Sequence, residues 1–245
     1  MKKVLPFYII VLLLQGMFAL ASCDKDNYKN MTSIPVPGPV PPNTDTGKKY
    51  LALGDSYTIG QSVDVQARFP AQTVAILRNS NITIKDPEYI ATTGWTTMNL
   101  MNAITSQNPK GPYDAVSLLI GVNDQYQRMD TAGYRRRFTD LLLKSIELAG
   151  NRPARVFVLS IPDYSATPFV AESDKARVRK EIDDFNNINK EITLRNNITY
   201  IDITPGSREA STNTALVAND GLHPSGLEYK KWAEKLAVEM KRVLQ

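Results

Sequence analysis

Cysteine and histidine are almost absent from this 245-residue sequence, which contains one residue of each kind. A single cysteine excludes an intramolecular disulfide and a cysteine-based zinc cluster. A single histidine disfavours the familiar hydrolytic zinc sites, which usually need two or three imidazole ligands. A carboxylate-only site for Mg²⁺ or Ca²⁺ stays open, since it needs neither residue.

A strong excess of one charge sign is also missing. The formal net charge is +4, and it falls to +2 without Lys2 and Lys3 of the amino-terminal segment. The cluster Arg135-Arg136-Arg137 is predicted to lie on the solvated face of an amphipathic helix. The opposite, buried face of that helix would carry Tyr134, Phe138, Leu141, Ser145 and Leu148. Nucleic-acid binding, which normally shows a basic stripe, is therefore not predicted.

A long hydrophobic run occurs at the amino terminus. The basic start Met1 to Lys3 and the apolar run from Val4 to Phe18 are typical of a secretory signal. Polar and helix-breaking residues interrupt the run, whereas a permanent span needs about 20 apolar residues. We therefore predict a leader over residues 1–22 and export of the protein, with an uncleaved anchor as the alternative.

The leader ends in Leu20-Ala21-Ser22-Cys23, which resembles the lipobox of bacterial lipoproteins. The resemblance implies cleavage before Cys23 and lipid chains on that residue, so the only thiol would be a membrane anchor. Two or more chains make anchoring stable, because each buried CH₂ contributes about 0.8 kcal/mol. We expect an exported bacterial lipoprotein that faces the periplasm or the cell surface.

Residues 24–48 show no hydrophobic periodicity and are rich in proline, as in an extended spacer. We therefore predict a lipidated tether over residues 23–48 and a folded domain over residues 49–245. In that domain short apolar runs alternate with amphipathic stretches, which predicts a parallel sheet with helices. The expected strands are 50–53, either 82–85 or 89–91, 115–120, 156–161 and 198–203. The sequence thus predicts a three-layer α/β/α domain around a mostly parallel five-stranded sheet.

Two further helices are predicted from apolar stripes that we assign to the core. One covers residues 174–195 with Val178, Ile182, Phe185, Ile188 and Ile192 on one side. The other opens with Ser225-Gly226-Leu227-Glu228, which fits a capping box. Its stripe consists of Trp232, Leu236, Met240 and Val243.

Polar residues that directly follow parallel strands are candidates for a site, because ligands gather at the carboxyl ends of such strands. Ser56 follows the first strand, and a serine hydroxyl needs a nearby base to act as a nucleophile. His223 is the only imidazole in the sequence, and Asp220 lies three residues before it, close enough to hold Nδ1–H. The Ser56 amide, the Asn123 side chain and a backbone N–H near Gly94 are suitable donors to an oxyanion.

The segments 54–60, 121–124 and 220–223, together with Gly94, are similar to the four sequence blocks of the SGNH hydrolase superfamily, the GDSL esterases and lipases. The resemblance implies a flavodoxin-like fold and an esterase without cofactor or metal. It also implies that Ser56 is the nucleophile, His223 the base and Asp220 the residue that orients it, with Ser56, Gly94 and Asn123 as oxyanion donors. The sequence departs from the family at Tyr57, where leucine is common.

Several alternatives remain at the level of sequence. Asp55 and Asp124 could form a paired-carboxylate site of the glycosidase kind, although Asp55 is more easily explained as a ligand of its own loop's N–H groups. The substrate could be an acylated glycan or a lipid ester such as a lysophospholipid. A catalytically silent surface-binding lipoprotein on the same fold is the alternative to an enzyme.

Overall fold

Five strands form a central sheet in the computed structural model, which describes residues 46–245. They are β1 (Tyr50–Gly54), β2 (Glu88–Ala91), β3 (Ala115–Leu119), β4 (Val156–Leu159) and β5 (Thr199–Ile201). Their spatial order is β2-β1-β3-β4-β5, and every pairing between neighbours is parallel. The predicted parallel α/β fold is confirmed, and its strand order is the flavodoxin-like one.

The three inner strands carry the apolar core. Every residue of β1, β3 and β4 is buried, as expected for strands that helices cover on both faces. The edge strands β2 and β5 are only partly buried. Of the two segments predicted for the second strand, 89–91 lies in β2, whereas 82–85 contributes only an isolated bridge between Ile84 and Lys48.

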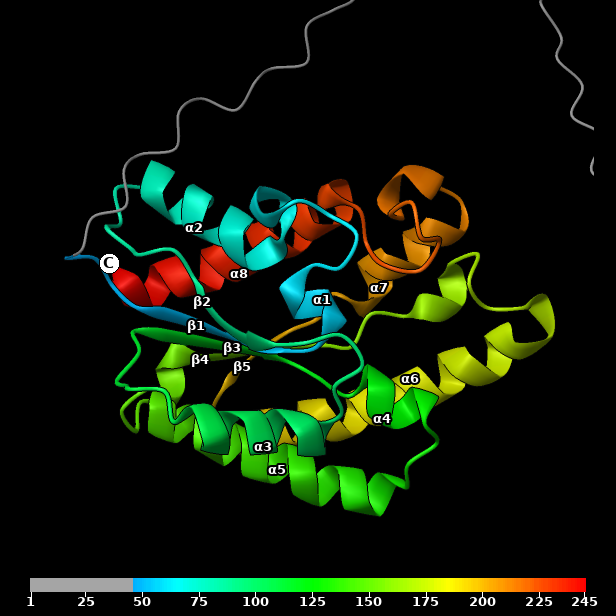
Figure 1. Ribbon diagram of the computed structural model, residues 1–245, viewed down its shortest axis with the longest axis horizontal. Helices are drawn as coiled ribbons and strands as arrows, with labels where there is room; N and C mark the ends of the chain where they lie inside the picture. Colours follow the sequence, from blue (N-terminus) through cyan, green and yellow to red (C-terminus); the bar gives the residue numbers. More distant parts are fainter. Residues whose placement is uncertain (1–45) are drawn as a thin grey trace, which may run out of the picture. The chain divides into compact units, whose positions relative to one another are not determined.

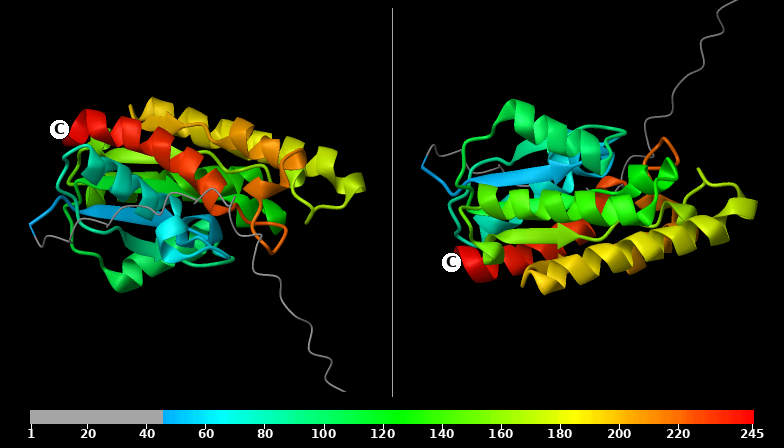
Figure 2. Two further views of the ribbon diagram at one scale, coloured as in Figure 1. Left: turned by 90° about the horizontal axis from the view of Figure 1, so that it is seen from above. Right: turned by 90° about the horizontal axis from the view of Figure 1, so that it is seen from below.

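Helices cover both faces of the sheet (Figure 1). The α-helices are α1 (Ser56–Ile59), α2 (Phe69–Asn79), α3 (Thr97–Gln107), α4 (Val122–Tyr126), α5 (Thr131–Leu148), α6 (Glu172–Arg195), α7 (Thr204–Ser207) and α8 (Gly226–Leu244). Short 3-10 turns are η1 (Val65–Ala67), η2 (Pro153–Arg155), η3 (Tyr164–Ala166), η4 (Arg208–Ser211) and η5 (Thr214–Leu216). Figure 2 shows α2 and α8 across one face, and α3, α5 and α6 across the other.

The predicted apolar stripes lie in the core. The stripe of α6 is buried along its length, and in α8 Trp232, Leu236 and Met240 are buried. The predicted capping box of α8 is wrong. Ser225 donates its hydroxyl to Ala215 O at 2.7 Å, and Glu228 Oε1 accepts from Trp232 Nε1 at 2.8 Å. A residue outside the helix thus takes the Ser225 hydroxyl, and a ring N–H one turn further along α8 takes the Glu228 carboxylate, so neither closes the cap.

The α5 helix has its predicted buried face, but its arginine cluster is not wholly solvated. Arg136 is exposed and Arg135 forms an ion pair with Glu191. Arg137 turns toward α4, where its Nη2 lies 3.2 Å from Oδ1 of the buried Asp124. The prediction is therefore wrong for Arg137, because a buried carboxylate on the neighbouring α4 helix draws the guanidinium inward.

The predicted leader, the anchor at Cys23 and most of the tether lie outside the described residues and stay predictions. Within residues 46–245, no helix has both the length and the apolar character that a membrane crossing requires.

The topology brings several loops to one edge of the sheet. After β1 the chain passes to the face covered by α2, whereas after β3 it passes to the face covered by α5 (Figure 1). The loops after the neighbouring strands β1 and β3 therefore run to opposite faces of the sheet. Such a switch point leaves room for a ligand at the carboxyl ends of the two strands.

Candidate active site

The loop after β1 places Ser56 at the start of α1. Asp55 precedes it as the N-cap, and its Oδ1 accepts from Tyr57 N at 3.0 Å. Gly60, in the left-handed region at φ 65°, ends this short helix. Ser56 is only 5% exposed, but its side chain lines a pocket. The local structure therefore presents a serine hydroxyl at the carboxyl edge of the sheet.

The segment before α8 holds an imidazole and a carboxylate in contact. His223 Nδ1 lies 2.6 Å from Asp220 Oδ2. The other carboxylate oxygen, Oδ1, accepts from the backbone N–H groups of Leu222 and His223, both at 2.9 Å. With Nδ1–H directed at Asp220, Nε2 is the basic nitrogen of a neutral imidazole. The segment can therefore supply an oriented base.

Several hydrogen bonds favour the charged form of Asp220. Burial raises its pKa, but bonds from the Ser62 hydroxyl, from the N–H groups of His223 and Leu222, and from the His223 ring outweigh that effect. The net result is a pKa well below the ordinary value of an aspartate. Asp220 therefore faces the imidazole as an anion, which is the form that stabilises an imidazolium.

Two further segments supply hydrogen-bond donors. Gly94 follows β2 and has φ 81°, a conformation that side chains rarely adopt. Asn123 lies in α4, and its Nδ2 donates to Trp95 O at 3.0 Å, next to Gly94. This bond orients the Asn123 amide against the Gly94 turn.

The predicted site residues meet around one pocket of about 230 Å³. Ser56, Gly94, Asn123 and His223 all line it, and Asp220 lies behind His223 through the Nδ1 contact. The remaining lining residues are Tyr57, Gln61, Thr93, Val122, Tyr126, Tyr164, Phe169 and Leu222. The structure thus brings a hydroxyl, an imidazole and an amide, far apart in the sequence, to a common cavity.

The paired-carboxylate alternative has no support in this geometry. Asp55 and Asp124 are fully buried, and neither lines the pocket. Asp124 accepts from Thr97 N at 2.8 Å and from Thr97 Oγ1 at 2.6 Å, besides its ion pair with Arg137. It therefore ties α3 to α4 and α5. Across residues 46–245, no group of three or more His, Cys, Asp or Glu side chains is arranged to hold a metal ion.

Asp55 is predicted to make stability fall with rising pH. Burial raises its pKa to about 8, against the lowering effect of the Tyr57 N–H bond and with a smaller raising contribution from Asp124. Between the unfolded pKa near 4 and the folded value, the native state holds a proton that the unfolded chain has lost, so the native state loses stability over this interval. The isosteric Asp55→Asn variant removes this titration.

We expect Asp55→Asn to unfold at similar urea concentrations to the parent at pH 5 and to be more stable at pH 8.5, on the order of 2 kcal/mol. Urea unfolding of both proteins at both pH values gives the difference in their free energies of unfolding. The other titrating groups are the same in the two proteins, so their contributions cancel in this difference. Parallel pH profiles for the two proteins would contradict the assignment.

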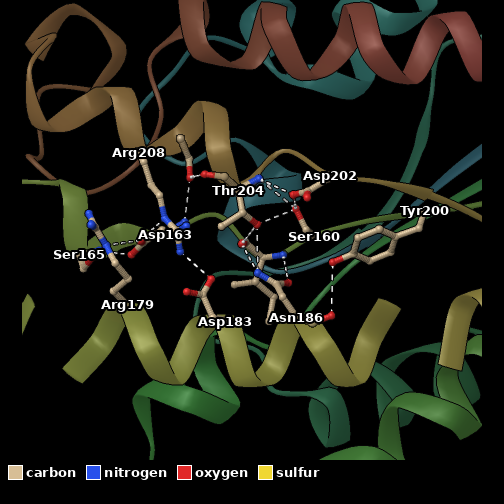
Figure 3. A network of polar contacts seen from close by, with 12 residues as sticks. Ser160, Asp163, Ser165, Arg179, Asp183, Asn186, Tyr200, Asp202, Thr204 and Arg208 are labelled. Carbon is tan, nitrogen blue, oxygen red and sulfur yellow. Dashed lines mark hydrogen bonds and ion pairs between the residues drawn. The ribbon is translucent and has the colours of Figure 1, made fainter. Parts of the chain in front are cut away.

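An ion-pair network around the buried Asp163 fixes the segment after β4 (Figure 3). Asp163 Oδ2 accepts from Arg208 Nε at 2.8 Å and from Arg179 Nε at 3.2 Å, and its Oδ1 caps the Ser165 N–H at 3.0 Å. Arg208 also donates to Asp183 at 2.6 Å. The network holds η3, η4 and α6 together, and η3 carries the pocket residue Tyr164.

The same segment reaches the His223 loop and the rim of the pocket. The Phe169 N–H donates to Gly221 O at 3.2 Å. The rings of Tyr126, Tyr164 and Phe169 form a cluster in which each pair of centroids lies 6.4 Å apart. Tyr126 is 58% exposed and Phe169 49% exposed, so this aromatic rim presents open ring surface beside Ser56 and His223.

Sequence reasoning missed two contributors to the site. Ser62 donates to Asp220 Oδ2 at 2.6 Å across 158 residues, and nothing in the local pattern of a loop serine indicates that partner. Asp163 follows Pro162 four residues after the end of β4, and this position in a loop after a strand is the one signal that could have pointed to it. Its two arginine partners lie 16 and 45 residues away and form no motif.

Comparison with known families finds one match. The model of the GDSL-like lipase/acylhydrolase family matches residues 52–231, which span the segments that carry Ser56, Gly94, Asn123, Asp220 and His223. No curated protein matches the chain.

Several solved structures share the fold. TesA superposes with a TM-score of 0.64 at 15% identity, over 80% of this chain and 99% of its own. Axe2, an acetylxylan esterase from Geobacillus stearothermophilus, has a TM-score of 0.60 at 20% identity, over 79% and 94%. The psychrotrophic esterase EstA from Pseudoalteromonas sp. has a TM-score of 0.61 at 14% identity, over 80% and 97%.

Proposed function

We propose that this chain, which belongs to the GDSL-like lipase/acylhydrolase family, hydrolyses carboxylic esters through an acyl-enzyme on Ser56. The observation that carries the proposal is the pocket that Ser56 and His223 share, with Asp220 2.6 Å from the far nitrogen of the imidazole. Nucleophile, base and orienting anion are the parts that serine acyl transfer requires.

In the proposed first step Ser56 Oγ attacks the ester carbonyl while His223 Nε2 takes the hydroxyl proton. The carbonyl oxygen becomes an oxyanion, for which the Ser56 and Gly94 N–H groups and the Asn123 amide are the donors. Collapse expels the alcohol, which receives the proton from His223, and leaves an acyl ester on Ser56. Water, activated by the same imidazole, then releases the acid and restores the serine.

The proposed mechanism requires a small movement of the Ser56 side chain. The Ser56 hydroxyl forms no hydrogen bond with any residue from 46 to 245, His223 included. Catalytic hydrogen bonds in unliganded sites are commonly long and tighten when substrate binds. A small rotation of the Ser56 side chain on substrate binding is therefore part of the proposal.

Covalent labelling tests the nucleophile. A fluorophosphonate probe is expected to modify the protein once, on the peptide that contains Ser56, with loss of esterase activity in proportion to labelling. Ser56→Ala is the matched control and should not react. Absence of labelling in a folded protein would instead favour the catalytically silent binding protein.

The cavities favour a short acyl group. The shared pocket is about 230 Å³, and the neighbouring cavity behind His223, lined also by Tyr57, Asp163 and Glu228, is only about 20 Å³. That smaller cavity is about the size of one water molecule. Among the described residues it offers no room for a long acyl chain, which weakens the lipid-ester alternative.

The aromatic rim favours a ring-bearing alcohol. A second groove of about 530 Å³ lies beyond Tyr126, Tyr164 and Phe169, and its lining includes Arg128, Asp174 and Arg177. Open aromatic faces beside charged and polar groups suit a sugar, which has apolar ring faces and a polar edge. The fold shared with an acetylxylan esterase agrees with this choice. We therefore propose an acylated glycan as the substrate.

Two comparisons test this substrate class. Rates on p-nitrophenyl esters are expected to fall steeply beyond butyrate, about tenfold or more by octanoate, because the cavity next to His223 holds only about 20 Å³ and cannot take a longer chain. Tyr126→Ala is expected to raise KM about five- to tenfold for an acetylated xylo-oligosaccharide and less for ethyl acetate, whose alcohol is too short to reach the rim. Leu143→Ala, an exposed residue of α5, is the control. Rates that rise toward long chains would overturn the glycan assignment.

A further inference from the structure

Ser62 lies in the loop between α1 and η1, and its hydroxyl reaches the anion of the His223 loop. Ser62 Oγ donates to Asp220 Oδ2 at 2.6 Å. The same oxygen contacts His223 Nδ1 at 2.6 Å. Among residues 46–245, Ser62 and His223 are the only side chains that bond to Asp220. The loop that follows the nucleophile helix is therefore joined to the acid of the proposed triad by a single hydroxyl.

The backbone of Ser62 adopts a conformation that costs free energy. Its φ is 67°, in the left-handed region that non-glycine residues enter at a cost of about 1 kcal/mol or more. Glycine would occupy this position without strain, as Gly60 does two residues earlier at φ 65°. Glycine could not make the bond to Asp220. The backbone conformation alone would favour glycine here, so the presence of serine is explained by the hydrogen bond of its hydroxyl.

We infer that Ser62 is a positioning residue of the esterase site, which fixes the Asp220 carboxylate and shares the charge that Asp220 presents to His223. The inference rests on the proposed function, in which Asp220 orients the base. Ser62 touches neither the substrate nor the reacting atoms. It acts through Asp220, and it connects the chain directly after Ser56 to the partner of the base.

The electrostatic effect of Ser62 has a definite sign. Of the interactions that lower the pKa of Asp220, the Ser62 hydrogen bond is the largest, ahead of the N–H bonds from His223 and Leu222. Without it the carboxylate draws the Nδ1 proton more strongly and stabilises the imidazolium more. The acid limb of kcat/KM, which reports protonation of the base, would then move to higher pH.

Other titratable groups also face this pair. Tyr57 of α1 has its ring centroid 5.6 Å from that of His223. The small cavity beside the imidazole is lined by Asp163, Tyr164 and Glu228. The negative charge of Asp220 also contributes to raising the pKa of Tyr229 in α8. Substitutions at Ser62 leave all of these in place. A shift of the acid limb would thus report the Ser62 bond itself.

The size of the effect is limited by solvent, because the Asp220 side chain is 28% exposed and water can replace part of the lost bond. For Ser62→Gly we expect kcat at pH 8 to fall about three- to tenfold, because the unheld carboxylate orients the imidazole less well and this loss outweighs its stronger pull on Nδ1–H. KM should stay unchanged within about twofold. We expect the acid limb of kcat/KM to move up by about 0.3 to 0.5 pH unit. Fluorophosphonate titration of active sites normalises each rate.

The conformation of Ser62 allows stability and catalysis to be separated. Ser62→Gly removes the hydroxyl but fits the left-handed backbone, so thermal stability should stay the same or rise. Ser62→Thr keeps the hydroxyl but places a β-branched residue at positive φ, so it should be less stable yet keep the parent pH profile. Asn151→Gly, at φ 57° near the amino end of β4, is the control for backbone relief far from the site.

Opposite outcomes would overturn the inference. If Ser62→Gly has the parent's kcat and acid limb, or if Ser62→Thr shifts the limb as Ser62→Gly does, the hydroxyl has no positioning role. Ser56→Ala distinguishes this failure from failure of the proposed function. An inactive, unlabelled Ser56→Ala with an unaltered Ser62→Gly overturns only the role of Ser62, whereas an active Ser56→Ala overturns the triad.

Discussion

Ser56→Ala is expected to lower kcat for p-nitrophenyl acetate by about 10⁴- to 10⁶-fold, since covalent catalysis is lost and only donors to the oxyanion and binding remain. The substitution removes one hydroxyl that has no hydrogen-bond partner among the described residues. The fold should therefore be unaffected, and the thermal unfolding midpoint should lie within about one degree of the parent's.

The His223→Ala variant should lose activity by a similar factor, because the nucleophile then has no base. The two losses are not expected to add: Ser56→Ala/His223→Ala should be no slower than either single variant, as for groups that act as one unit. Esterase assays of all three variants at equal protein concentration, corrected for background hydrolysis, measure these losses. A folded His223→Ala protein with the parent's rate would refute the assignment of the base.

Gly54→Ala is expected to destabilise the fold by about 3 kcal/mol or more. Gly54 ends β1 directly before Asp55 and Ser56, and a Cβ there would lie 2.1 Å from Thr58 Oγ1 and 2.4 Å from Leu119 O. The second contact is with the backbone of a neighbouring strand, which cannot rotate away. β1 and β3 would have to separate at the edge that carries the pocket.

Gly206→Ala is the matched control for this prediction. Gly206 lies in α7, where an added Cβ meets nothing closer than Glu228 Oε1 at 3.9 Å. Alanine in a helix should raise stability by about 0.5 to 1 kcal/mol. Urea unfolding of both variants measures the contrast, and a Gly54→Ala protein as stable as the parent would show that the strand end yields more readily than its contacts indicate.

The parts of the fold that follow from local patterns could be predicted from the sequence. Continuous apolar runs fixed the inner strands β3 and β4, and 3.6-residue stripes fixed α5 and α6. The edge strand is ambiguous in the sequence because residues 82–85 and 89–91 are both short and contain β-branched or aromatic residues, and only the pairing of 88–91 with β1 in the fold decides between them. Ser225 and Glu228 fit a local cap, but Ser225 bonds to Ala215 outside the helix and Glu228 accepts from Trp232 one turn further along α8.

The candidate site divides in the same way. Ser56 and Asn123 could be predicted because each lies in a short segment directly after a predicted strand. His223 could be predicted because it is the only histidine in the sequence and Asp220 lies three residues before it. Ser62 and Asp163 could not, since their roles come from partners that only the fold brings close. Arg137 shows the same limit, because its helical position predicts solvent and the neighbouring helix supplies a carboxylate.

The bond from Phe169 to Gly221 bears on how this enzyme could be redesigned. The segment that contains Phe169 lines the pocket, and its hydrogen bond to Gly221 joins it to the turn that carries His223. Widening the pocket at Phe169 would therefore also displace the base. Val122 and Thr93 also line the cavity and take no part in this bond, but each is next in sequence to a proposed oxyanion donor, Asn123 or Gly94. Changes that admit bulkier acids are therefore expected to alter turnover as well, through the base at Phe169 and through the oxyanion donors at Val122 and Thr93.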